Sequence, residues 1–210
     1  MAENSPKRPF VVAVSGGSGS GKTTLVDMLQ DKLSCKAALI EMDNYYLDRS
    51  HVPKKERALL NYDHPDAIDG ELLYEHIRAL KEGKNISYPQ YDFKNHVRSE
   101  SKKFQPEKIL IIDGIFALYH KKIAPLLDLK IYVDCDSDVR LSRRLLRDSK
   151  QRARAPESVI SQYLATVKPM HEKYIEPTKY HADFMVPWHI KNQTSVSAIA
   201  AVIEASIVSE

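Results

Sequence analysis

The sequence predicts an α/β fold in which a parallel β-sheet of about five strands is flanked by helices. Short apolar runs alternate along the chain with longer segments that have helical spacing of apolar residues. A glycine-rich loop also joins the first apolar run to the first helical segment. The strands are expected at Phe10–Val14, Ala37–Ile40, Ile109–Ile112, Leu129–Val133 and Phe184–Val186. The helices are expected at Thr23–Leu33, Glu71–Lys81, Asp138–Arg147, Pro156–Tyr174 and Ser195–Ile207.

Capping residues and prolines set the expected helix ends. Polar residues that suit an N-cap stand at the start of three of the helices, namely Asp69, Ser137 and either Thr194 or Ser195. Pro156 suits a first helical turn, where its missing N–H has no partner to lose. Pro169 lies inside the same segment, and we expect the helix to kink or break there.

Length and composition indicate one compact domain, 1–210, with 43% hydrophobic and 28% charged residues. The net charge of +3 is too small to indicate a nucleic-acid partner by itself. Two cysteines, Cys35 and Cys135, do not make a disulfide framework, so a reducing, cytoplasmic location is expected. No apolar run reaches the length of about 20 residues that a membrane span needs, and the first residues lack the pattern of a secretory signal.

The glycine-rich loop, Gly16-Gly-Ser-Gly-Ser-Gly-Lys-Thr23, has the spacing of a P-loop and predicts a P-loop NTPase fold. Its glycines let the backbone aim N–H groups at an anion, and the following helix adds its positive end. Lys22 can reach the outer phosphates of a nucleoside triphosphate, and the Thr23 hydroxyl can hold Mg²⁺. A Gly/Ser linker would lack the apolar strand before the loop and the amphipathic helix after it. The expected nucleotide-binding residues are Gly16, Gly17, Ser18, Gly19, Ser20, Gly21, Lys22, Thr23 and Thr24.

Two carboxylates at the ends of predicted strands are candidates for chemistry. Asp113 ends the third strand, where an acid can hold Mg²⁺ together with Thr23. Asp43 follows the second strand and could accept a proton from a substrate hydroxyl, or could form a turn with Asn44; the pattern alone leaves both open. The chain lacks the Asn-Lys-x-Asp element of GTPases, and it lacks the acidic pair and the length of motor or AAA-type ATPases.

Two segments outside the predicted strands indicate a substrate site and a lid. The interval 44–108 is long, polar and aromatic, with one predicted helix, and an insert of this kind usually binds substrate. The segment 147–157 continues a helix in which arginines interleave with leucines, for which a nucleic-acid patch and a solvated helix are the alternatives. Because arginine suits bidentate contacts with phosphate, we expect an arginine-rich lid that neutralises charge and excludes water.

Further motifs follow one another through essentially the whole chain. They are Gly16–Thr23, Met42–Tyr46, Asn61–Asp69, Tyr88–Phe93 with His96 and Arg98, Asp113–Ile115, Arg140–Asp148, Ser161–Tyr163, Val167–Pro169, Glu176–Tyr180 and Ala182–Asp183. Together they resemble the uridine kinase (uridine–cytidine kinase) family. The Asn-Tyr-Asp-His-Pro-Asp and Gln-Tyr-Asp-Phe segments are much more specific for that family than the P-loop is.

The resemblance implies transfer of the γ-phosphate of ATP or GTP to the 5′-hydroxyl of uridine and cytidine, giving UMP and CMP for pyrimidine salvage. Asp43 would activate that hydroxyl, and Thr23 and Asp113 would hold Mg²⁺. The remaining catalytic residues, which would contact phosphates, are Lys22, Arg147 and Arg152. The protein would take a small nucleoside as substrate and no nucleic-acid or membrane partner, and it would form a homo-oligomer, by resemblance a tetramer.

The resemblance also implies a nucleoside site. Asp63, helped by Arg144, would hold the ribose 2′- and 3′-hydroxyls, while Tyr91 and His96 would read the pyrimidine edge. We expect Tyr91 and Phe93 to point to opposite sides of an extended segment, so that only one of them packs on the base. The full set of substrate-binding residues would be Asp43, Tyr46, Asp63, Tyr91, Phe93, His96, Arg144, Arg154 and Gln162.

The chain departs from the family pattern at three places. Ala153 stands where many members have a lid glycine, and Asp113 where many have glutamate. Trp188–Asn192 differs from the Arg-Gly-rich segment that is usual near the donor base, so the choice between ATP and GTP is left open. The alternative functions are a kinase of nicotinamide riboside or ribulose phosphate, and a nucleotide-dependent regulatory or RNA-binding protein.

Overall fold

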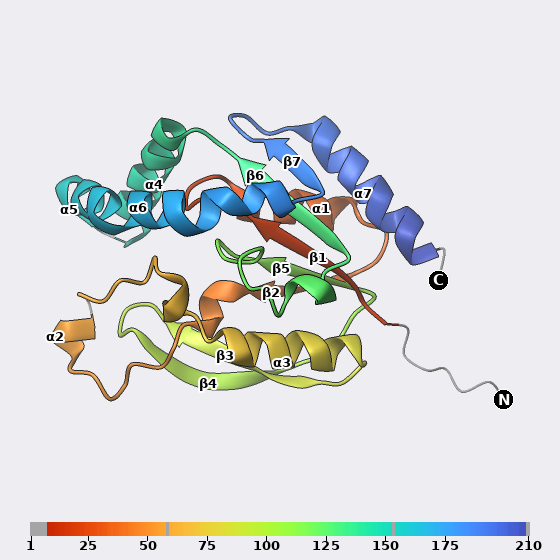
Figure 1. Cartoon of the computed structure of the whole chain (residues 1–210), viewed down its shortest axis with the longest axis horizontal. Helices are drawn as coiled ribbons and strands as arrows, with labels where there is room; N and C mark the ends of the chain where they lie inside the picture. Colours follow the sequence, from red (N-terminus) through yellow and green to blue (C-terminus); the bar gives the residue numbers. More distant parts are fainter. Residues whose placement is uncertain (1–7, 58, 153, 209–210) are drawn as a thin grey trace.

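The centre of the molecule is a five-stranded parallel sheet with the strand order β2-β5-β1-β6-β7, seen in the computed structural model of Figure 1. The structure describes residues 8–57, 59–152 and 154–208; Ala153 and the side chain of Arg152, both assigned to the lid, lie outside the described residues. The strands are β1 (Phe10–Ser15), β2 (Ala37–Glu41), β5 (Ile109–Asp113), β6 (Leu129–Asp134) and β7 (Phe184–Pro187). All five predicted strands are therefore confirmed, each within about one residue at its ends.

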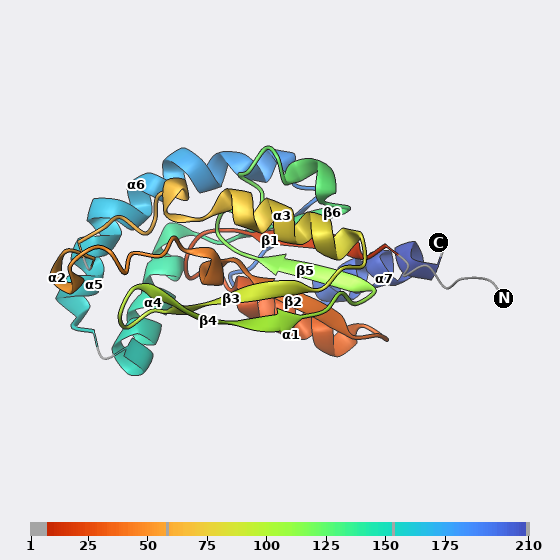
Figure 2. The same cartoon turned by 90° about the horizontal axis from the view of Figure 1, so that it is seen from below.

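Helices cover both faces of this sheet (Figures 1 and 2). On one face α1 and α7 pack against Val12 and Val14, and on the other α3 packs against Val11 and Ala13. The alternate side chains of β1 are apolar in both directions, which is why its sequence is a continuous apolar run. The bounds of the helices that cover the sheet or extend beyond its edge are α1 (Lys22–Lys32), α3 (Gly70–Lys81), α4 (Ser137–Arg152) and α7 (Gln193–Val208).

Two of the expected helix starts are confirmed and two are wrong. Asp69 caps α3, because its Oδ1 accepts a hydrogen bond of 3.1 Å from the backbone N–H of Leu72. Pro156 is the first residue of α5 (Pro156–Gln162). The helix α4 begins at Ser137 itself, so Ser137 does not cap it from outside.

The cap of α7 also differs from the expectation. Asn192 accepts a hydrogen bond of 3.0 Å from the backbone N–H of Ser195, so neither Thr194 nor Ser195 is the N-cap. The helix starts earlier than its apolar pattern because its first turn is polar. None of the helices in the described ranges is both long and apolar enough to cross a membrane.

The helical stretch from α5 onward passes through Pro169 without ending, so of the expected kink or break, the break is wrong. A π-helical turn over 163–167 precedes the short α6 (Lys168–Met170), and a second one over 171–175 follows it. A π-helical turn shifts the hydrogen-bond register by one residue, which accommodates the missing N–H and the ring of a proline. A 3₁₀ turn over 176–181 completes the stretch.

The insert contains a two-stranded antiparallel sheet that the sequence pattern did not reveal. Its strands are β3 (Ile86–Asp92) and β4 (Val97–Phe104), and the insert also contains α3 and a short helix, α2 (Lys54–Arg57). Most of β4 is exposed and polar, so it lacks the apolar alternation that marks a half-buried strand. In β3 the pairing register shifts between Tyr88 and Gln90, on either side of Pro89.

A buried ion pair fastens the end of α3 to the sheet. The Lys81 side chain is only 4% exposed, and its ammonium lies 2.9 Å from Asp128 Oδ2. It also donates a hydrogen bond of 2.6 Å to the carbonyl oxygen of Leu126. Asp128 Oδ2 in turn accepts a hydrogen bond of 2.8 Å from the backbone N–H of Val11 in β1. One carboxylate therefore joins a helix, a loop and the central strand.

We expect Lys81→Met to lower the free energy of unfolding by about 2–3 kcal/mol, because it removes charge-assisted hydrogen bonds in a buried site. Urea denaturation measures this change. Lys84→Met is the matched control, since the Lys84 side chain is 68% exposed and its partner Glu82 lies at the surface. Equal stability of the two variants would contradict the anchoring role of Lys81.

Candidate active site

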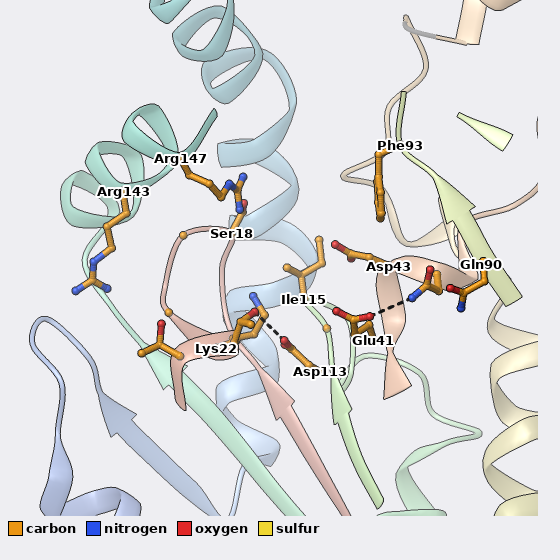
Figure 3. Close-up of a pocket in the computed structure, with 16 residues that line it drawn as sticks. Ser18, Lys22, Glu41, Asp43, Gln90, Phe93, Asp113, Ile115, Arg143 and Arg147 are labelled. Atoms are coloured by element: carbon orange, nitrogen blue, oxygen red, sulfur yellow. Dashed lines mark hydrogen bonds between the residues drawn. The ribbon is translucent and has the colours of Figure 1, made fainter. Parts of the chain in front are cut away.

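The P-loop and the carboxyl ends of β1, β2 and β5 enclose a cavity of about 580 Å³, which we call the P-loop cavity (Figure 3). Six predicted nucleotide-binding residues line it: Ser18, Gly19, Gly21, Lys22, Thr23 and Thr24. The other three, Gly16, Gly17 and Ser20, are buried. The structure therefore divides the predicted loop residues into those that face the cavity and those that support the loop from the interior.

Close packing explains why the loop needs glycine. Gly19 has a φ of +80°, and a Cβ there would lie 2.4 Å from the carbonyl oxygen of Arg140. Gly21 has a φ of +99°, and a Cβ there would lie 2.5 Å from the Trp188 ring. Trp188 is 2% exposed and packs behind the loop. At both positions a larger residue would be strained by its backbone and would clash with its neighbours.

The half-buried Lys22 places a cation in the wall of the P-loop cavity. Its Nζ donates a hydrogen bond of 3.3 Å to the carbonyl oxygen of Gly17. Burial lowers the pKa of Lys22, and the negative charges of Asp113 and Asp43 oppose that shift. The ammonium is thus held between the loop and two carboxylates, in a place where it can contact an anion in the cavity.

Thr23 and Asp113 form a pair that fits a divalent cation. The Thr23 hydroxyl donates to Asp113 Oδ2 at 3.0 Å, while Asp113 Oδ1 is buried without a hydrogen-bond partner. Burial raises the pKa of Asp113, and Lys22 opposes the shift. The described residues contain no cluster of three His, Cys, Asp or Glu side chains that could hold a metal ion. Mg²⁺ typically uses only one or two carboxylates and completes its shell with phosphate and water oxygens, so this donor set suits it.

A second cavity of about 160 Å³ adjoins the first, and we call it the aromatic cavity. All nine predicted substrate-binding residues line it: Asp43, Tyr46, Asp63, Tyr91, Phe93, His96, Arg144, Arg154 and Gln162. They come from the turn after β2, from the insert, from α4, from the segment before α5 and from α5 itself. The structure thus brings together residues that lie up to 119 positions apart in the sequence, between Asp43 and Gln162.

Aromatic rings form one wall of this cavity. Tyr62 stacks on His96 with ring centroids 4.6 Å apart, and Tyr46 meets Tyr62 edge-on at 5.5 Å. Tyr91 and Phe93 also meet edge-on at 5.3 Å, so the expectation that they point to opposite sides is wrong. Residues two apart in an extended chain share a face, which is the physical reason for that contact. Tyr62 also lines this cavity and lies within the Asn61–Asp69 motif, although the predicted substrate-binding residues do not include it.

His96 adopts an uncommon backbone conformation within this wall. Its φ is +54°, which is rare for a residue other than glycine. Burial lowers the pKa of His96, so the ring is neutral near pH 7. Its Nδ1 atom is buried without a hydrogen-bond partner. A neutral imidazole can donate from one nitrogen and accept at the other, which suits the recognition of a polar ring edge.

Arginines connect the two cavities. Arg144 donates to Ser18 Oγ of the P-loop and to Gln162 Oε1, each at 2.9 Å. Arg154 donates to the same Gln162 oxygen at 2.7 Å. Arg147 lines both cavities, and its Nε donates to Asp148 at 2.8 Å. The guanidinium groups of α4 thus face the region where the cavities meet.

The two cavities share five lining residues: Ser18, Asp43, Phe93, Ile115 and Arg147. Asp43 lies in a 3₁₀ turn, Met42–Tyr45, directly after β2, and its side chain extends into the P-loop cavity in Figure 3. Asp43 therefore belongs to a turn with Asn44, as one interpretation expects, and its position facing both cavities leaves the proton-acceptor role as a prediction. A carboxylate at this junction can meet groups held in either cavity.

Other functional residues were missed by the sequence analysis. Asn44 is buried, and it donates to Tyr88 Oη at 3.0 Å while its Oδ1 accepts 3.0 Å from the backbone N–H of Tyr91. Arg143 donates to the carbonyl oxygens of Ser20 and Trp188, each at 3.0 Å. The sequence predicts Asn44 only as a turn residue and Arg143 only as part of a basic stretch, since neither side-chain contact leaves a local pattern. The remaining missed lining residues of the P-loop cavity are Glu41, Gln90, Gly114 and Ile115.

Comparison with known proteins agrees with the fold and the motifs. Residues 11–195 match the phosphoribulokinase/uridine kinase family. A uridine kinase from Staphylococcus haemolyticus is 44% identical over 199 residues, which cover 94% of this chain and 96% of the relative. A uridine kinase from Staphylococcus aureus is 43% identical over 203 residues, which cover 96% and 98%.

A solved structure gives the same architecture. Phosphoribulokinase from Rhodobacter spheroides has a TM-score of 0.65 at 20% sequence identity, over 86% of this chain and 70% of that one. The predicted P-loop α/β fold is thus confirmed by an independent structure as well as by the strand order. The match to the family spans nearly the whole chain and includes both cavities, and the chain therefore belongs to the phosphoribulokinase/uridine kinase family.

Proposed function

We propose that this kinase transfers the γ-phosphate of ATP or GTP to the 5′-hydroxyl of uridine and cytidine. The observation that carries the proposal is the position of Asp43 and Arg147, which line both the P-loop cavity and the aromatic cavity. A transfer between two molecules needs both of them in contact at one place. The curated relatives that are 43–45% identical over most of the chain are uridine kinases, which supports the same acceptor here.

The P-loop cavity is the proposed donor site. Backbone N–H groups of the loop and the Lys22 ammonium would neutralise the triphosphate. Thr23 and Asp113 would hold Mg²⁺, which when bound supplies positive charge to the β- and γ-phosphate oxygens. The hydrogen bond of 3.0 Å between Thr23 and Asp113 and the unpartnered Asp113 Oδ1 support this assignment.

The aromatic cavity is the proposed nucleoside site. Asp63 offers a carboxylate for the 2′- and 3′-hydroxyls of ribose, since both hydroxyls can donate to it at once. Tyr91 and the neutral His96 would contact the polar edge of the pyrimidine, with Tyr46 and Phe93 beside the base. A neutral imidazole can meet either the O4 of uridine or the N4 of cytidine, which accounts for a site that accepts both.

Asp43 is the proposed base. Bond formation to a phosphoryl group passes through a loose transition state, so Asp43 would orient the hydroxyl and take its proton late in the reaction. Arg147 would stabilise charge on the transferring group, together with the predicted lid residue Arg152. The lid over 147–157, the substrate insert over 44–108 and the single domain over 1–210 are part of this proposal. So are a homotetramer, on the family resemblance, and a cytoplasmic location, on the low cysteine content.

A panel of acceptors tests the proposal directly. We expect donor consumption with uridine and cytidine, and a 5′-monophosphate product for each by mass spectrometry. Nicotinamide riboside and ribulose 5-phosphate are the competing acceptors, and ATP and GTP should be compared as donors. Faster turnover with either competing acceptor than with uridine and cytidine would show that the competing acceptor is the substrate. Salt-sensitive binding to RNA without a phosphorylated product would instead favour a regulatory protein.

We expect Asp43→Asn to lower kcat for uridine by about 100-fold or more, because the amide can no longer take a proton. Uridine binding, measured by calorimetry, should stay within about threefold of wild type, since the side chain keeps its size and its hydrogen-bonding oxygen. Asp27→Asn on α1 is a control for a carboxylate outside the two cavities. Full turnover by Asp43→Asn would show that the base lies elsewhere.

We expect Asp63→Ala to raise the KM for uridine by about 10-fold or more, because it removes the acceptor of two ribose hydroxyls. The preference for uridine over 2′-deoxyuridine should largely disappear, while the KM for the nucleotide donor should not change. Steady-state kinetics with both acceptors measures these effects. Asp66→Ala, an exposed neighbour, is the control. An unaltered preference for the riboside would rule out Asp63 as the ribose-binding group.

A further inference from the structure

We propose that Thr166 is a positioning residue that holds the Asp63 carboxylate and thereby sets the preference of this enzyme for ribosides. The inference rests on the proposed function, in which Asp63 binds the ribose. The Thr166 hydroxyl donates a hydrogen bond of 2.8 Å to Asp63 Oδ2 across 103 residues of sequence. Asp63 lines the aromatic cavity, whereas Thr166 is not part of the lining and reaches the carboxylate from outside it.

The position of Asp63 in the chain explains why its carboxylate needs a support. Asp63 follows the short helix α2 and precedes a 3₁₀ turn, Pro65–Ala67, so neither a helix nor a strand contains it. Its backbone N–H donates a hydrogen bond of 3.0 Å to Asn61 Oδ1. This is a local turn contact that does not orient the Asp63 side chain. An aspartate in such a loop has freedom about its side-chain bonds that must be lost before it binds two hydroxyls.

The supporting residue lies on a rigid element. Thr166 belongs to the π-helical turn over 163–167, one turn after Gln162. Gln162 is itself held by Arg144 and Arg154 at 2.9 and 2.7 Å. Thr166 is half-buried, and its branched side chain has few alternative rotamers. One helical surface therefore presents Gln162 to the cavity and Thr166 to the carboxylate.

The Thr166 hydroxyl has two possible hydrogen-bond acceptors, and Asp63 is the stronger one. Thr166 Oγ1 is 2.8 Å from Asp63 Oδ2 and 3.2 Å from the carbonyl oxygen of Gln162. A hydroxyl has one proton, and the shorter contact to a charged acceptor is the stronger one. A carboxylate has about four lone-pair sites, so the bond to Thr166 leaves Asp63 enough of them for a ribose diol.

Arg144 is the group that would compete for an unsupported carboxylate. Burial lowers the pKa of Arg144, and the negative charge of Asp63 opposes that shift, so the two charged groups interact. Without Thr166 the Asp63 side chain could turn toward this cation and away from the ribose position. The Thr166 hydroxyl fixes one oxygen of the carboxylate and keeps the other available, which favours an acceptor that offers two adjacent hydroxyls.

The test is Thr166→Val, which removes the hydroxyl and keeps the shape of the side chain. We expect the KM for uridine to rise about 10-fold, with kcat within about threefold of wild type and the KM for the donor unchanged. The ratio of kcat/KM for uridine to that for 2′-deoxyuridine should fall by about 10-fold. The reason is that 2′-deoxyuridine lacks the 2′-hydroxyl and therefore depends less on the orientation of the Asp63 carboxylate. Thr166→Ser restores the hydroxyl and should restore both values to within about threefold.

Ser161→Ala is the matched control, since Ser161 is an exposed hydroxyl residue on α5, and it should behave like wild type. A Thr166→Val enzyme with the wild-type KM and riboside preference would overturn the inference. So would a loss of kcat and donor affinity accompanied by a lowered Tm, which would indicate general unfolding. Failure of the wild type to phosphorylate any riboside would overturn the proposed function and this inference together. Uridine turnover by the wild type with an unaffected Thr166→Val would overturn only the role of Thr166.

Discussion

The pairing of β1 between β5 and β6 is the constraint on which both cavities depend. In this register Val14 of β1 and Glu41 of β2 both pair with Asp113. A shift by one residue would turn Asp113 to the other face of the sheet, away from Thr23. The side chains of β1 and β5 pack into two separate cores, one on each face of the sheet, so such a shift would require both cores to repack. The chemistry at the edge of the sheet is therefore fixed by the core beneath it.

The aromatic cavity depends on polar contacts to a larger extent. Asn44 joins the turn that carries Asp43 to the β3 backbone at Tyr91. Arg98 of β4 donates to the carbonyl oxygen of Tyr46 at 3.0 Å and to Asp69 Oδ2 at 3.0 Å. The exposed β4 has little apolar surface to bury, so directional bonds place the hairpin where packing alone would leave it loose. The hairpin that carries Tyr91 and His96, the residues proposed to contact the pyrimidine, is thus oriented by its bonds to the turn that carries Asp43.

The parts of the fold that could be predicted were those with a local signal. The five sheet strands are apolar runs, and the P-loop has regularly spaced glycines because its backbone adopts conformations that other residues rarely adopt. β4 was missed because its exposed sequence has no apolar alternation, and the passage of the helix through Pro169 depends on π-helical turns that leave no mark in the sequence. Motifs were enough to select residues such as Asp63 and His96. Contacts such as Asn44 with Tyr91 or Thr166 with Asp63 link distant segments, and no local pattern records them.

Arg144 shows how the two cavities constrain each other. Arg144 is 6% exposed, and a guanidinium keeps its charge even when buried, so each donor without an acceptor is costly. Its two terminal nitrogens donate to Ser18 of the P-loop and to Gln162 of α5, whereas its Nε makes no hydrogen bond and lies 3.7 Å from Asp148 Oδ2. Rotating either acceptor away would leave a buried donor of a charged group without a partner, which costs more than the bond itself is worth. Arg144 therefore fixes the orientation of both Ser18 in the P-loop and Gln162 in the aromatic cavity. A movement of either side chain would alter the hydrogen bonding of the other.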